Sequence, residues 1–133
     1  MKVFLVAYAA ALLAFLVIDG IWLGVVARQF YATELGDLLK RNILALPAAV
    51  FYLGYTAGLV YLAVRPGEPD LSLLNVALTG ALVGLMAYGT YDMTNLATVR
   101  DWPVLMSVVD MIWGAVLSGA VALTAASVVR KFM

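Results

Sequence analysis

Three aspartates interrupt the long apolar stretches of this chain: Asp19, Asp92 and Asp110. A charged carboxylate at the centre of a bilayer helix costs roughly 2.5–3.5 kcal/mol on insertion scales. Such a residue is tolerated chiefly when it is protonated, paired, or turned toward a bundle interior or an aqueous cavity. Asp19 and Asp110 also begin two matched runs, each with a tryptophan three residues later, at Trp22 and Trp113. We expect function to depend on these acids.

The sequence leaves several kinds of chemistry open to such acids. A protonatable carboxylate can couple proton movement to transport, a carboxylate pair can act as general acid and base, and Asp and Asn oxygens can hold a hard cation. Helical spacing of three or four residues gathers aromatic and polar side chains on the same faces. The pocket candidates are Asp19, Trp22, Tyr88, Asp92, Asn95, Asp110 and Trp113, with Tyr52 and Tyr55 reaching in from the second helix. No catalytic residue, metal ligand set or cofactor follows from this pattern.

The protonation state of the acids is also left open. Arg28, Arg41 and Arg100 are expected nearer the mouth of such a pocket. A nearby guanidinium would hold an aspartate ionised, whereas burial among aromatic residues without one would keep it protonated. A structural role is the competing interpretation, because buried polar side chains can hold helices together and tryptophans can mark a membrane interface.

Composition predicts the elements that must position these residues. Hydrophobic residues make up 65% of the 133 residues and charged residues only 12%. The charges cluster between four apolar stretches, at about 3–27, 43–64, 71–95 and 103–129. Each stretch meets the length of roughly 20 residues needed to cross about 30 Å of hydrocarbon. We therefore predict an all-α, integral membrane four-helix bundle with short loops, forming one domain over residues 1–133 with the lipid bilayer as its surroundings.

The residue types exclude several classes of site. The chain has no cysteine and no histidine, which excludes disulfides, zinc sites of the usual ligand type, histidine-ligated haem and Cys-His nucleophiles. A net charge of zero removes the electrostatic argument for nucleic acid as a partner.

The predicted orientation rests on the chain ends. The first apolar stretch is too long for a secretory signal and is expected to be retained. Lysine and arginine are equally numerous on the two sides of the membrane. The positive charge of the terminal amine therefore decides the orientation, and it favours both termini in the cytoplasm.

Packing is predicted from small residues and from periodicity. Each helix carries a small-xxx-small pair, which predicts a close-approach face: Gly20/Gly24, Gly54/Gly58, Gly80/Gly84 and Gly114/Ser118. The expected inward faces contain Tyr8, Leu12, Phe15, Asp19 and Trp22, then Ala81, Leu85, Tyr88, Asp92 and Asn95, then Met106, Asp110, Trp113 and Leu117. The first loop, 28–41, is predicted to include a short interfacial helix weakened by Gly36.

A set of ordered motifs resembles a bacterial family called domain of unknown function 2177. The motifs are Asp19-x-x-Trp22-Leu, Phe51-Tyr52 with Gly58-Leu-Val-Tyr61, Ala63-Val-Arg-Pro66, Tyr88-Gly-x-Tyr91-Asp92-x-Thr94-Asn95-Leu-Ala-Thr98, Trp102-Pro103 and Asp110-x-x-Trp113-Gly114. The resemblance covers essentially the whole chain. It implies a small multi-pass protein of the bacterial cytoplasmic (inner) membrane, without an established activity.

Three functions are compatible with these observations. The leading hypothesis is a membrane-embedded protein that binds or transports a small molecule or ion through its aspartates, and that needs a homo-oligomer to form a pore. The alternative is a lipid-modifying enzyme, or an accessory subunit of one, whose lipid substrate enters sideways from the bilayer. The third is a purely structural or partner-binding subunit.

Overall fold

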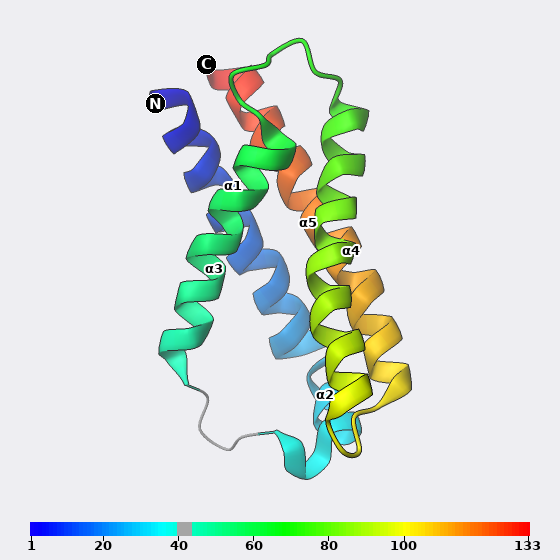
Figure 1. Ribbon diagram of the computed structural model, residues 1–133. Coiled ribbons are helices and arrows are strands. Elements are labelled where there is room, and N and C mark those ends of the chain that lie inside the picture. Colours follow the sequence, from blue (N-terminus) through cyan, green and yellow to red (C-terminus); the bar gives the residue numbers. More distant parts are fainter. Residues whose placement is uncertain (40–43) are drawn as a thin grey trace.

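The computed structural model describes residues 1–39 and 44–133, and the described residues form five α-helices (Figure 1). Two π-helical turns extend α1 and α3, and a 3-10 turn follows α2. The helices are α1 (Lys2–Ile21, extended by Trp22–Val26), α2 (Arg28–Leu35, followed by Gly36–Leu38), α3 (Ala45–Leu59, extended by Val60–Val64), α4 (Leu73–Thr98) and α5 (Val104–Phe132).

Four helical segments are long and apolar enough to cross a membrane: Lys2–Val26, Ala45–Val64, Leu73–Thr98 and Val104–Phe132. The predicted all-α architecture with four spans is therefore confirmed. The predicted start of the second span, residue 43, lies outside the described residues. Both termini lie at one end of the bundle, and α2 lies at the opposite end (Figure 1).

Local sequence explains where the helices begin and end. The hydroxyl of Ser72 accepts a hydrogen bond from the Asn75 backbone N–H at 3.0 Å, which caps the start of α4. Pro103 directly precedes α5, where its fixed φ and missing N–H suit a helix start. Gly36, at φ +52°, ends α2 in a conformation that favours glycine, so the short helix predicted in the first loop stops there.

The centre of the bundle is α5. It contains twelve buried residues, against four each in α1 and α4. Its tightest seam is with α4, where a Cβ on Gly80 would lie 2.9 Å from the Cβ of Ala122, and one on Gly84 would overlap the carbonyl oxygen of Gly114. These glycines let the two backbones approach closely, as small residues do at membrane helix interfaces.

The packing predictions are correct for two helices and wrong for the other two. A Cβ added to Gly20, Gly24, Gly54 or Gly58 would meet nothing within 4 Å, so these pairs are not contact faces of the bundle described here. Leu85, expected to face inward, is 45% exposed, because the buried stripe of α4 instead follows Val76, Gly80, Gly84 and Asp92. Glycines form much of the buried face of α4, and a search for periodic hydrophobic residues does not count glycine.

The two kinds of glycine provide a matched test. Gly84→Ala should lower the free energy of unfolding by about 1–3 kcal/mol, because the added methyl group overpacks the α4–α5 seam. Gly54→Ala should be neutral, or stabilising by up to roughly 1 kcal/mol, since its site is open and alanine favours a helix. Unfolding of the detergent-solubilised variants measures both. Equal losses at the two positions would contradict the packing described here.

Candidate functional site

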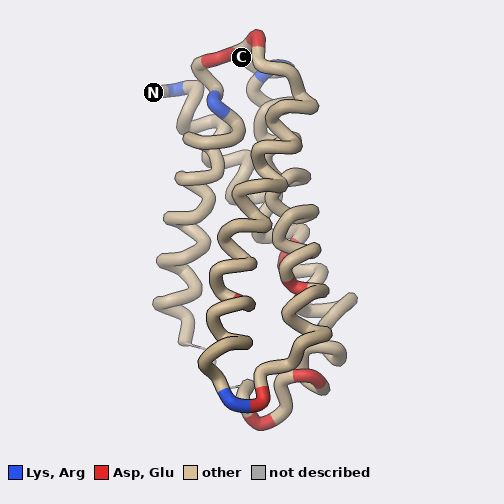
Figure 2. The backbone as a smooth tube through the Cα atoms, turned by 45° about the vertical axis from the view of Figure 1, so that its right-hand side comes forward, with Lys and Arg blue, Asp and Glu red and all other residues tan. Residues whose placement is uncertain are grey.

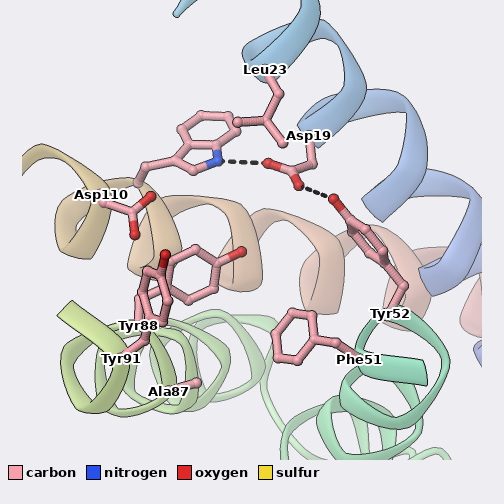
Figure 3. A pocket seen from close by; sticks show the side chains of 9 residues that line it. Asp19, Leu23, Phe51, Tyr52, Ala87, Tyr88, Tyr91 and Asp110 are labelled. Atoms are coloured by element: carbon pink, nitrogen blue, oxygen red, sulfur yellow. Dashed lines mark hydrogen bonds between the residues drawn. The ribbon is translucent and has the colours of Figure 1, made fainter. Parts of the chain in front are cut away.

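A pocket of about 320 Å³ lies among α1, α3, α4 and α5 (Figure 3). It is near the end of the bundle that carries α2. Two carboxyl groups and five aromatic side chains dominate its walls. The lining residues are Asp19, Leu23, Phe51, Tyr52, Ala87, Tyr88, Tyr91, Asp110 and Trp113.

Asp19 is held by donors from two other helices. Its side chain is only 4% exposed. The Tyr52 hydroxyl donates to Oδ2 at 2.6 Å, and the Trp113 indole N–H donates to Oδ1 at 3.0 Å (Figure 3). The Tyr52 ring is positioned in turn by an edge-on contact with Phe15, which is fully buried one helical turn before Asp19. Both oxygens of Asp19 are therefore satisfied inside an apolar bundle.

Asp110 is held by a residue of the short helix α2. The Tyr31 hydroxyl donates to Asp110 Oδ1 at 2.7 Å, and the same hydroxyl accepts the Trp22 indole N–H at 3.2 Å. Burial raises the pKa of the Tyr31 phenol above its ordinary value, so this hydroxyl stays protonated and can donate. The Trp22 ring stacks on the Trp113 ring, with centroids 4.2 Å apart and planes 10° apart. A hydrogen-bonded chain thus ties α2 to the pocket.

Asp92 is buried and does not line the pocket. Its side chain is completely buried, and neither carboxyl oxygen has a hydrogen-bond partner among the described residues. Asp110 is its neighbouring acid, but no hydrogen bond links the two carboxyl groups. A buried carboxylate without a partner, next to a second acid, is energetically unfavourable.

The basic side chains of the described residues do not line the pocket. Within residues 1–39 and 44–133, no Lys or Arg is among the lining residues. Arg28 and Arg100, expected near the mouth, are exposed and do not line it, and Arg41 lies outside the described residues. Figure 2 shows the basic residues of the described chain at the two ends of the bundle, whereas acidic residues also lie between them. The described residues of the pocket wall therefore supply no positive charge to balance these acids.

The structure brings most of the sequence-predicted residues together. Asp19, Tyr88, Asp110 and Trp113 line the pocket, and so does Tyr52. Trp22 stacks behind Trp113, whereas Asn95 is partly buried away from the pocket, one turn beyond Asp92. Tyr55 bonds to Ser118 instead of to an acid, at 2.6 Å.

Sequence reasoning missed Tyr31 and Phe51 as site residues. Tyr31 belongs to the first loop, for which the sequence predicts only a short interfacial helix, yet its hydroxyl is the partner of Asp110. A contact between residues so distant in the chain leaves no periodic signal. Among the described residues, no group of three or more acidic side chains is arranged to hold a metal ion.

These features define a class: a small multi-pass α-helical membrane protein with a carboxylate-containing pocket between its helices. The chain belongs to the family described as predicted membrane protein (DUF2177), whose model matches residues 4–127. No curated protein and no solved structure matches it.

A double-mutant cycle tests the bond between Asp19 and Tyr52. Asp19→Asn and Tyr52→Phe should each lower the free energy of unfolding by about 1–3 kcal/mol, because each removes a hydrogen bond to a buried carboxylate. The double variant should lose less than the sum of the two. Tyr61→Phe, at a tyrosine that is 74% exposed, is the control and should change little. Additive losses in detergent unfolding would show that the two side chains do not interact.

Asp92→Asn should have the opposite effect on stability from Asp19→Asn. The amide removes a buried carboxyl group that has no partner, and its N–H can donate to Asp110. We expect the midpoint of thermal unfolding to be unchanged or raised. A loss as large as that of Asp19→Asn, measured in the same detergent, would mean that Asp92 has a stabilising partner.

Proposed function

We propose that this protein binds a small organic cation within the membrane, in the pocket that Asp19 and Asp110 line. One observation carries the proposal: two carboxyl groups share an aromatic cavity, and none of the lining residues in the described part of the chain is basic. The ligand is then the natural source of the balancing positive charge.

The aromatic walls favour an organic cation over a metal ion. Tyr88, Trp113 and Phe51 are among the lining residues, and contact of an ammonium group with an aromatic ring face is worth about 0.5–2 kcal/mol. A hard metal cation instead prefers six or more oxygen ligands. Here both Asp19 oxygens and one Asp110 oxygen already accept hydrogen bonds, and the remaining wall is largely apolar. The volume of about 320 Å³ is at the lower end of small-molecule pockets.

The depth of the acids strengthens the interaction. Asp19 precedes the end of its span, Val26, by seven residues, or about 10 Å of helix, and Asp110 follows Val104 by six, or about 9 Å. With a hydrocarbon core about 30 Å thick, both acids lie well below the membrane surface. Electrostatic attraction is less screened there than in water.

Transport is the activity that such a site serves most directly. Polar residues within membrane helices commonly mark substrate pathways. In this proposal the protein acts in the bacterial inner membrane with both termini in the cytoplasm, and a homo-oligomer completes the pathway across the bilayer.

A lipid-modifying activity is the second candidate. It is favoured by one observation, the pair of acids in a pocket whose wall includes exposed apolar residues. Asp19 and Asp110 would then act as general acid and base on a lipid. Lipid profiles of cells with and without the gene test it, and identical profiles under several growth conditions would rule it out.

Binding of a matched pair of probes tests the cation proposal. Benzyltrimethylammonium should quench the fluorescence of Trp22 and Trp113 in protein held in nanodiscs, and should bind at least about tenfold more tightly than neopentylbenzene, its uncharged isostere. Asp19→Asn and Asp110→Asn should each weaken binding of the cation by about tenfold or more.

The control variant is Asp70→Asn, at an exposed acid outside the pocket, and it should bind the cation like the unmodified protein. Equal binding of the two probes, or binding of the cation that both pocket variants leave intact, would refute the proposal. Flux of the bound cation into proteoliposomes then separates transport from binding alone.

A further inference from the structure

The end of the pocket that points toward α2 is covered. Trp22 stacks on Trp113, and Tyr31 reaches from α2 to bond Asp110. Ala27, at the start of α2, is only 3% exposed. Figure 1 shows α2 at this end of the bundle, beyond the last turns of α1. A ligand arriving from the water on that side would meet a layer of packed aromatic rings.

The side of the pocket between α3 and α4 is open. Of the lining residues, Phe51 of α3 is 46% exposed, Tyr91 of α4 is 54% exposed, and Leu23 is 44% exposed. α4 packs against Val60–Val64 rather than against the first part of α3, and Figure 1 shows α3 diverging from α4 toward its N-terminal end. Other exposed residues in the first half of α3, such as Leu46 and Val50, are also apolar.

We infer that the ligand is a single-chain amphiphile, an ammonium group joined to an apolar chain, that enters from the lipid between α3 and α4. This inference rests on the proposed cation-binding function. The head group reaches Asp19 and Asp110, while the chain passes between Phe51 and Tyr91 into the bilayer. A side opening lined by apolar residues suits a molecule that is already dissolved in the membrane.

The same geometry disfavours the aminophospholipids of the bilayer as ligands. Their ammonium group is attached to a phosphate, and a phosphate would be brought toward the two carboxyl groups of a pocket whose described lining residues include no Lys or Arg. A single-chain amine carries no such anion. The experiment must therefore distinguish a single-chain amine from an aminophospholipid as the ligand.

Two probes with the same head group test the inference. In nanodiscs of phosphatidylglycerol, decyltrimethylammonium should bind at least about tenfold more tightly than tetramethylammonium, after correction for partition into nanodiscs that lack the protein. Phe51→Gln should remove most of this difference, because it places a polar side chain where the apolar chain passes. Leu53→Gln is the matched control, on the same helix, with the original side chain 50% exposed and outside the pocket lining.

The outcomes separate this inference from the function on which it rests. If benzyltrimethylammonium binds in an Asp19-dependent manner but the decyl chain brings no advantage, or if Phe51→Gln and Leu53→Gln act alike, the lateral route is wrong and the cation site stands. If no ammonium probe binds in an Asp19-dependent manner, both fail. If added phosphatidylethanolamine competes with decyltrimethylammonium for the pocket, the ligand is a bilayer lipid. That result would overturn the inference of a single-chain amphiphile.

Discussion

The constraint on which the rest of this structure depends is the need to satisfy carboxyl groups inside an apolar bundle. Asp19 meets it with donors from α3 and α5, and Asp110 meets it with a donor from α2. Since each acid is bonded to a different segment of the chain, these few polar contacts fix how α1, α2, α3 and α5 are arranged around one pocket. Helix packing in lipid has little hydrophobic drive of its own, so such contacts have particular weight.

The two matched Asp-x-Ile-Trp runs are connected to each other. Trp113 donates directly to Asp19, whereas Trp22 reaches Asp110 through the hydroxyl of Tyr31, and the two indole rings stack. The spacing of three residues turns each tryptophan to the same face as its own aspartate. The tryptophans therefore hold the opposite acid in place while closing the α2 end of the pocket.

The helices are packed unevenly, and the pocket lies where they are further apart. Gly84 and Gly114 bring α4 and α5 so close together that this seam leaves no space for a ligand. The first part of α3 has no comparable contact with α4, and Phe51 and Tyr91 stay exposed at the edge of the space between them. The closely packed pair of α4 and α5 therefore forms one wall of the pocket, and the separation of the first part of α3 from α4 leaves one side open.

The sequence by itself determined the four spans, because length and apolar composition suffice to identify helices that satisfy their own backbone within lipid. It also indicated Asp19, Asp110 and Trp113, because polar side chains are costly there and few. Only the tertiary structure decided that Asp92 does not line the pocket, that Tyr31 is the partner of Asp110, and that the glycines of α1 and α3 make no close contact with other described residues. Those outcomes depend on how helices rotate and cross, and periodicity within one helix carries no information about its neighbours.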